Sequence, residues 1–203
     1  MPIILGEGRE GDEEAMIILV AEKFGKRLVG RVMGREHYAK GCQLLTRARG
    51  GEVVVFDFFG VEIITGSWFN AMIVPLYHWA GQPQNDLFPL LTNLQEDWID
   101  DLSLVAEWNR QCYLVASGST ESPEQAMLVG SLDVAQSECF ARVRQEGEST
   151  GAGLARMQGE GAVGPTAWNN RLKELYKKRL IKCRKHGKER VYFPVVQEIL
   201  ANG

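Results

Sequence analysis

The chain has 203 residues, of which 45% are hydrophobic and 24% charged, and a formal net charge of -3. These values are ordinary for a folded protein and argue against a disordered chain. The N-terminal stretch MPIILGEGREGDEEAMIILVAEKFG interrupts its apolar runs with acidic residues. It matches neither a signal peptide nor a membrane span, so we expect a cytoplasmic protein without membrane contact.

The first half alternates strand-like and helix-like segments. We expect strands at 16–24, 52–58, 86–94 and 112–116, and helices at 34–48, 67–80 and 96–111. Ser67 is placed to cap the second helix, which carries Trp68, Met72 and Leu76 on one side. Pro89 favours an edge position or a bulge for the third strand. The alternation predicts an α/β fold, a sheet covered by helices.

A stretch rich in Ser, Glu and Pro, SGSTESPEQ, follows this half and is typical of a linker. We therefore divide the chain into a domain at 1–116, a linker at 117–131 and a second domain at 132–203. Two domains with different roles fit the uneven charge distribution described below.

The second domain is predicted to contain three helices and a hairpin. The first helix, 133–147, is capped by Asp133 and ended by Gly147, with Val134, Cys139 and Val143 facing inward. A short glycine-containing helix follows within 149–159, and Pro165 opens the third. Two short strands around the turn at 185–188 complete the pattern of a winged helix-turn-helix.

Positive charge is concentrated near the end of the chain. The segment from Arg171 to Arg190 holds ten lysines and arginines against Glu174 and Glu189, so the remainder of this acidic chain is strongly negative. Such an asymmetry favours a segment that faces nucleic acid. A solvated basic helix with no ligand is the alternative.

Helical spacing separates the third helix into two faces. Trp168, Leu172, Leu175 and Tyr176 share the inward face. The opposite side and the hairpin present amides and cations, which bond base edges and phosphates. The residues predicted to contact DNA are Thr166, Asn169, Asn170, Arg171, Lys173, Lys177, Lys182, Arg184, Lys185, Lys188 and Arg190.

The segment from Leu132 to Val196 resembles the winged-helix DNA-binding domains of bacterial transcriptional regulators. The residues that carry the resemblance are Thr166, Ala167, Asn170, Arg171, Leu172, Leu175, Leu180 and Ile181, with the closing aromatics Tyr192 and Phe193. The resemblance implies a recognition helix followed by a basic wing. The glycine-rich second helix departs from the usual pattern of the family.

The segment from Met16 to Ala116 resembles the STAS-like domains of unknown function found in bacteria. The matching residues are Asp57, Phe58, Gly60, Val61, Ser67 and Phe69. The resemblance implies an α/β sandwich related to anti-sigma factor antagonists, which bind protein partners and can be switched by serine phosphorylation. Ser67 matches the phosphorylated serine by position and is a candidate regulatory phosphosite; the alternative is a plain helix cap.

No pattern points to catalysis, a metal or a cofactor. The four cysteines are far apart, without a nearby histidine cluster, and are expected to be buried reduced thiols. Asp57 has no identifiable partner for proton transfer and is expected to form a turn. The glycine-containing stretches GEGREG and GAGLARMQGEG do not follow a strand and open a helix, as a nucleotide site requires.

The sequence thus favours a cytoplasmic DNA-binding regulator, with a STAS-like domain that senses or docks a partner and a winged helix that binds duplex DNA. A homodimer is compatible with this interpretation, because two half-sites multiply the affinity of a single small reader. A protein-interaction adaptor of a partner-switching pathway is the main alternative. An enzyme whose site residues cannot be paired by sequence is a weaker one.

Overall fold

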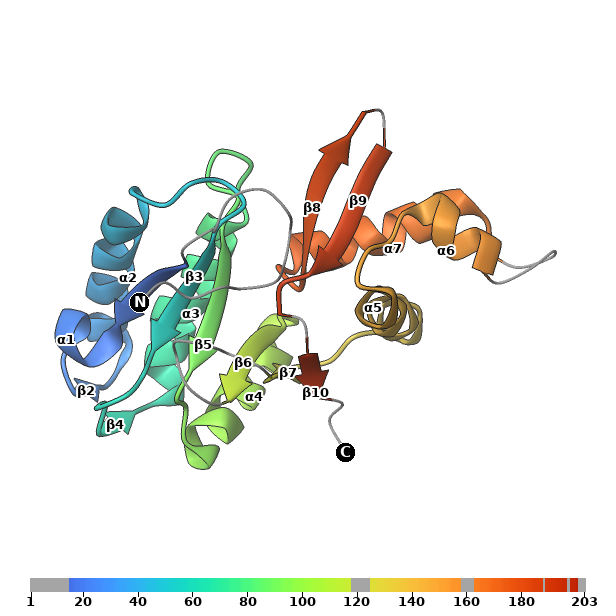
Figure 1. The fold of residues 1–203 in the computed structure, drawn as a ribbon. Coiled ribbons are helices and arrows are strands. Elements are labelled where there is room, and N and C mark those ends of the chain that lie inside the picture. Colours follow the sequence, from blue (N-terminus) through green and yellow to red (C-terminus); the bar gives the residue numbers. More distant parts are fainter. Residues whose placement is uncertain (1–14, 118–124, 158–162, 188, 197, 201–203) are drawn as a thin grey trace.

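The computed structural model describes residues 15–117, 125–157, 163–187, 189–196 and 198–200. Six strands of the described residues form one sheet in the order β1-β3-β5-β6-β7-β10 (Figure 1). Strands β1, β3, β5 and β6 are parallel, β7 is antiparallel to β6, and β10 is parallel to β7. The strands of this sheet are β1 (Met16–Leu19), β3 (Val53–Asp57), β5 (Phe88–Thr92), β6 (Tyr113–Ser117), β7 (Gln125–Val129) and β10 (Glu198–Leu200). The predicted α/β class is confirmed.

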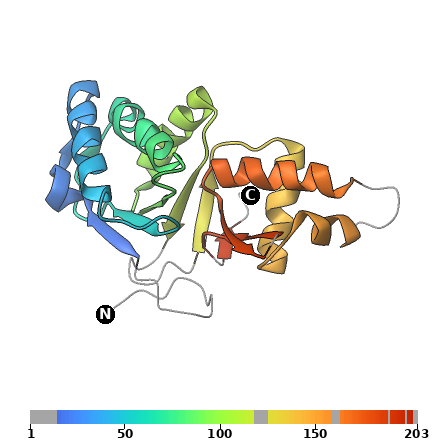
Figure 2. The same ribbon diagram turned by 90° about the horizontal axis from the view of Figure 1, so that it is seen from above.

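Four helices and a small strand pair accompany the first half. The helices are α1 (Val20–Phe24), α2 (Arg31–Leu45), α3 (Gly66–Ala80) and α4 (Glu96–Asn109). Strands β2 (Arg27–Leu28) and β4 (Ile63–Ile64) pair in parallel apart from the main sheet. Figure 2 shows α2, α3 and α4 together on one side of the sheet. None of the helices in the described ranges has the length and apolar character needed to cross a bilayer.

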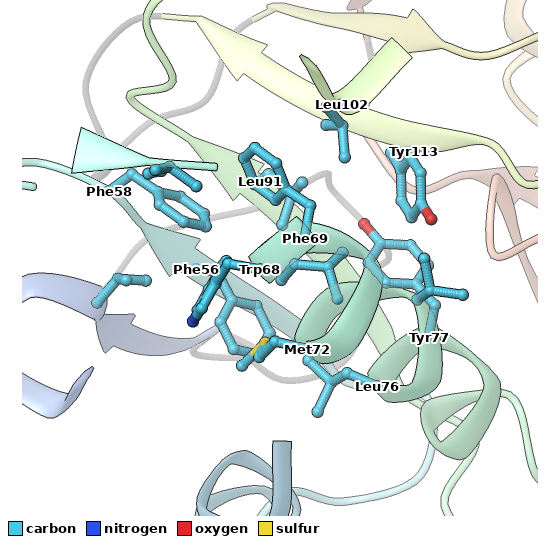
Figure 3. Packing of buried hydrophobic residues seen from close by; sticks show 14 of the residues in the cluster. Phe56, Phe58, Trp68, Phe69, Met72, Leu76, Tyr77, Leu91, Leu102 and Tyr113 are labelled. Atoms are coloured by element: carbon cyan, nitrogen blue, oxygen red, sulfur yellow. The ribbon is translucent and has the colours of Figure 1, made fainter. Parts of the chain in front are cut away.

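The first hydrophobic core lies between these helices and the sheet. Figure 3 shows its centre, where Trp68, Met72 and Leu76 of α3 pack near aromatic residues of the strands, as their spacing predicts. Helix α2 approaches α3 closely because Gly34 lies at the contact. A Cβ atom at Gly34 would be 2.7 Å from the Cβ of Ala71, so a larger residue would push the helices apart.

The C-terminal elements cover the other face of the sheet. They are α5 (Val134–Glu146), α6 (Gly151–Met157), α7 (Pro165–Lys177), β8 (Ile181–His186) and β9 (Glu189–Pro194). Along β3, Val54 and Phe56 belong to the first core, whereas Val53 and Val55 belong to a second core with residues of α5, α6 and α7. This alternation follows from the two-residue period of a strand. The C-terminal elements and the sheet therefore share a hydrophobic core.

Two predictions about the strands are wrong. The apolar run 16–24 is not one strand: β1 ends at Leu19, level with the last residue of β3, and α1 follows at once. Strand β5 lies between β3 and β6 and is not at an edge. Pro89 is tolerated there because β6 pairs with β5 only from Leu91 onward, so the missing N–H of Pro89 faces no strand on that side.

Two predictions about the helices also need correction. Ser67 does not cap α3, because the N-cap position is Thr65 and the first turn includes Ser67. Val134 does not face inward; its side chain is 87% exposed, while Cys139 and Val143 are buried as expected. The predicted boundaries of α5 are confirmed: the Asp133 carboxylate accepts from the Gln136 N–H at 2.7 Å, and Gly147 ends the helix with a φ of 71°.

The segment predicted as a linker contains part of the sheet. Residues 125–129 form β7, whose antiparallel register with β6 runs from Tyr113↔Val129 to Ser117↔Gln125. Residues 118–124 lie outside the described residues. Ala126 belongs to the second core and Val129 to the first, so both faces of β7 are covered. A short continuous apolar run of this kind lacks the alternation that marks a strand in a sequence. The division of the chain into two domains stays a prediction.

Candidate nucleic-acid interface

Helix α7 is built as the sequence predicts. It begins with Pro165 at its first position, where a missing N–H costs nothing. Trp168, Leu172 and Leu175 are fully buried in the second core, and Tyr176 is half-buried. Because this face is anchored, the opposite face is held outward.

The outward face of α7 carries four of the predicted DNA contacts. Thr166, Asn170, Lys173 and Lys177 are all exposed. Lys177 forms an ion pair with Glu174 at 2.6 Å, which neutralises part of its charge locally. Lys173 has no ion pair within the described residues. Lys173 is therefore the cation of this face that is most available to an anionic ligand.

The cations of the hairpin divide between its two faces. Lys185 and Arg190 are paired across the strands and lie on the same face as Cys183 and Tyr192, which packs on Tyr176 of α7. Lys182 and Arg184 lie on the opposite face, each 5.7 Å from the ring centre of Phe193. The hairpin cations therefore do not form one continuous row. Lys188 lies outside the described residues.

Arg184 is held by a second contact. Its Nη2 donates to the Glu148 carboxylate at 2.6 Å. Glu148 precedes Ser149, which exchanges two 2.8 Å backbone hydrogen bonds with Tyr192 of β9. The chain between α5 and α6 thus pairs with the outer edge of β9 and fixes the hairpin against the helices.

A polar groove lies where α6, α7 and β9 meet. Its volume is about 370 Å³, and its lining includes Asn169 and Lys173 of α7 and Arg190 of β9. Three of the predicted DNA contacts, from two separate elements, are therefore brought to one concavity. Thr150, Gly151, Ala152, Glu189 and Tyr192 complete the lining.

Glycine at position 151 makes this groove possible. A Cβ atom there would lie 2.4 Å from Oδ1 of Asn169, so a larger residue would displace the Asn169 side chain from its place against the start of α6. The Thr150 hydroxyl accepts from the Gly153 N–H at 3.0 Å and caps the helix. The glycines of α6 were expected only to weaken this helix, and Thr150 and Gly151 were not predicted to belong to the candidate site. The Thr-Gly order ahead of the apolar residues was the available signal.

Arg171 points to a different part of the surface. Its guanidinium lies 4.6 Å from the ring centre of Trp168 and forms an ion pair with Glu138 of α5 at 3.2 Å. Arg142 lies 5.9 Å from the same ring and pairs with Glu138 at 3.7 Å. These contacts join α5 to α7, so Arg171 is occupied within the protein.

Two cations of the basic segment contact the α/β half. Arg179 is buried and donates to Oδ1 of Asp86 at 2.6 Å and to the Gly81 carbonyl at 2.9 Å. Lys178 donates to the Arg110 carbonyl at 3.3 Å. The charge count of the segment therefore overstates the charge available to a ligand.

Tyr176 completes the contact around Arg179. Its hydroxyl donates to Oδ1 of Asp86, and the Arg179 guanidinium lies 4.7 Å from its ring centre and 5.0 Å from that of Phe88. Burial, followed by the hydrogen bond to Asp86, raises the pKa of Tyr176 to about 12. The end of α7 is thus fixed beside β5 by a partly buried network that the sequence did not reveal.

The candidate phosphosite lies at the start of α3. The Ser67 hydroxyl is 3.1 Å from that of Thr65, and the Asp101 carboxylate accepts from the Gly66 N–H at 2.9 Å. Asp101 already supplies the negative charge that this helix end favours. A phosphate on Ser67 would be close to that carboxylate. Phosphorylation of Ser67 stays a prediction.

Asp57 lies at the end of β3 and is buried. Its Oδ1 accepts from the Phe59 N–H at 2.8 Å and from Asn93 at 2.7 Å. The first bond is that of a turn-forming residue, as predicted. Within the described ranges, no three His, Cys, Asp or Glu side chains form a group that could hold a metal ion. All four cysteines are free thiols; Cys112 and Cys139 are buried, and Cys42 and Cys183 are half-buried.

Comparisons with protein families, curated proteins and solved structures give no match for this chain.

Proposed function

We propose that this protein binds duplex DNA through a winged helix formed by α5, α6, α7 and the β8–β9 hairpin. The element order supports this assignment: a helix, a short pairing at Ser149, two further helices and a hairpin. In helix-turn-helix proteins the recognition helix enters the major groove. Helix α7 takes that role, and the hairpin takes the role of the wing.

The observation that carries the proposal is the groove between α7 and the hairpin. Asn169 and Lys173 reach it from one element and Arg190 from another, beside the exposed Thr166 and Asn170. Amides bond base edges, and cations bond phosphates. A surface that combines both, anchored by a fully buried Trp168, suits a nucleic-acid backbone.

The test is a salt series of binding to duplex DNA, measured by fluorescence anisotropy. Affinity should fall steeply with salt, because each neutralised phosphate releases counterions. Lys173→Ala and Arg190→Ala should each weaken binding and reduce the slope by about one. Lys177→Ala should have a smaller effect because Glu174 already pairs with Lys177.

The matched control is Lys26→Ala. Lys26 is an exposed lysine paired with Glu62 beside β2, on the far side of the sheet from the hairpin (Figure 1). Its loss changes the net charge equally but should leave the slope unchanged. Absence of binding at low salt, or equal effects of all four substitutions, contradicts the proposal.

The α/β half is proposed to be the STAS-like unit that senses or docks a partner, and no catalytic chemistry is required. Phe59 supports a docking role: its side chain is 79% exposed, directly after the turn that Asp57 fixes. The same observation favours the alternative, an adaptor that binds only proteins. An adaptor would bind no DNA at any salt concentration. In a co-purification from cell lysate it would retain a protein partner, and the Phe59→Asp variant would not retain that partner.

A further inference from the structure

Helices α2 and α4 flank α3 and have opposite charge. Both pack on α3, on the same side of the sheet (Figure 2). The exposed charged residues of α4 are all acidic, whereas those of α2 are cations with one exception, Glu36. The acidic residues of α4 are Glu96, Asp97, Asp100 and Glu107, and the cations of α2 are Arg31, Arg35 and Lys40.

The charges at the N-terminal ends of α2 and α4 form no ion pairs among the described residues. Arg31 and Arg35 form no ion pair with any described residue, and neither do Asp97 and Asp100. Lys40 differs, because it bonds the Lys23 carbonyl and lies over the Phe24 ring. The layer therefore presents two unpaired and oppositely charged edges.

Exposed apolar side chains accompany both edges. Val32 in the first turn of α2 is 65% exposed. Near the end of α4, Leu104 is 66% and Trp108 is 84% exposed, and their spacing of four residues places them on one side of the helix. Exposed tryptophans are typical anchors of protein interfaces.

From this arrangement we infer that a second copy of this chain docks on the α2–α3–α4 layer. Successive parallel strands are joined by these helices on one face, so all three helices run in the same direction. A twofold axis along α3 then places α2 against α4 of the partner, with the same ends together. Such an interface is self-complementary, because each copy supplies one basic and one acidic edge.

The lengths and charges of the two helices fit this pairing. Helix α2 has 15 residues and α4 has 14. Arg31 and Arg35 in the first turns of α2 come opposite Glu96, Asp97 and Asp100 in the first turns of the partner's α4. Leu104 and Trp108 come opposite the second half of the partner's α2. Both contacts occur twice in the dimer.

The inference does not depend on DNA binding, and its test uses the full chain without DNA. Sedimentation equilibrium gives the mass of the unmodified protein, which should be that of a dimer and should shift toward the monomer as salt is added. Arg31→Glu with Arg35→Glu, and separately Asp97→Lys with Asp100→Lys, should each weaken association at least about tenfold.

The decisive step mixes these two charge-reversed proteins. One has two acidic edges and the other two basic edges, so an equal mixture should form a heterodimer although each protein alone is monomeric. A chain with all four substitutions should again form a homodimer. These two rescues require the pairing of α2 with α4 of another copy, and docking of a different protein does not produce them.

Folding is checked by circular dichroism and by the unfolding midpoint of each variant. All four side chains are exposed and form no ion pair with the part of the chain that the structure describes, so the midpoints should change little. If a reversal unfolds the chain, Arg31→Gln with Arg35→Gln and Asp97→Asn with Asp100→Asn replace it and should still weaken the dimer. A monomer at every concentration, dimers unaffected by both pairs, or a mixture that stays monomeric overturns the inference.

Discussion

At the scale of single residues, His37 has an unusual task. Its Nδ1 accepts a hydrogen bond from Nε1 of the fully buried Trp68 at 3.1 Å, so this nitrogen must be unprotonated. Burial, followed by the charge of Lys40, lowers the pKa of His37 below its ordinary value of 6.5. Protonation of Nδ1 would place the N–H of His37 against the N–H of Trp68, and the hydrogen bond would be lost.

The structure therefore predicts a pH-dependent stability. The unfolded chain takes up the His37 proton at a higher pH than the folded chain, so the free energy of unfolding should fall as the pH falls below 6.5. The contribution should be constant above that pH, where both states are neutral. Urea unfolding across the range from neutral to mildly acidic pH measures this dependence.

Two substitutions separate the proton from the hydrogen bond. His37→Asn keeps an acceptor near Nδ1 but does not titrate, so the fall below pH 6.5 attributed to His37 should disappear. His37→Phe leaves the buried Trp68 donor unpaired and should cost about 1–3 kcal/mol at neutral pH, and this cost should shrink below pH 6.5, where the unmodified chain itself loses stability. A His37→Asn protein with the full pH dependence of the unmodified chain would refute this account.

At the scale of the elements, the contact between α6 and α7 depends on one missing side chain. Gly151→Ser should displace the Asn169 amide, because its Cβ would lie against that side chain, and should change the free energy of unfolding by less than about 1 kcal/mol, because the Asn169 side chain can rotate away. It should also weaken DNA binding by moving Asn169 and narrowing the groove. Thermal unfolding and the anisotropy assay report the two effects.

Gly164→Ser is the matched control for this prediction. Gly164 is the N-cap of α7, has a φ of -71°, and has no atom within 4 Å of an added Cβ. A serine there can cap the helix and should leave stability unchanged or raise it. Equal losses from both substitutions would show that glycine flexibility, and not the close approach, is what matters.

The same elements show what the sequence could and could not predict. The ends of α5 and the start of α7 were predictable because Asp133, Gly147 and Pro165 act on their own backbone neighbours. The buried face of α7 followed from helical spacing. Strand β10 escaped prediction because it pairs with β7, a strand distant in sequence, which a local pattern does not encode. Strand β7 was missed because it directly follows the stretch rich in Ser, Glu and Pro, which is typical of a linker.

The candidate site was predictable to a lesser degree. Residue type identified the cations, but their destinations depend on tertiary contacts. Arg179 forms an ion pair with Asp86, and Arg171 forms one with Glu138. Both arginines belong to the same basic stretch as Lys173, which remains exposed. Alternation along the hairpin was expected, yet which of its faces meets α7 follows only from the packing of Tyr192 on Tyr176.

At the scale of the whole molecule, the shared second core predicts a single cooperative unfolding transition. Four of the five tryptophans lie in helices α3 and α4, and the fifth, Trp168, lies in α7. The tryptophan fluorescence of a Trp168→Phe variant therefore reports on the α/β half alone, whereas far-ultraviolet circular dichroism reports on the whole chain. The two probes should give coincident denaturation curves for this variant. Two resolved transitions would mean that the halves fold independently.

Arg179→Met tests what couples the halves. It leaves the Asp86 carboxylate without its buried partner and should lower the free energy of unfolding by about 2–3 kcal/mol, less than a fully buried pair because Asp86 is partly exposed. If this contact couples the unfolding of the two halves, the denaturation curves of the two probes should no longer coincide in the Arg179→Met variant. Lys178→Met, which removes an exposed contact to the Arg110 carbonyl, is the control.

The position of β10 beside β7 has a consequence for how the protein is made. The ribosome delivers β7 early, whereas its neighbour β10 follows only after all of α5, α6, α7, β8 and β9. Until then the nascent chain presents an open strand edge, which is a site for mispairing and aggregation. Translation speed and chaperone supply should therefore change the yield of native protein, and they should leave the free energy of unfolding of the finished protein unchanged.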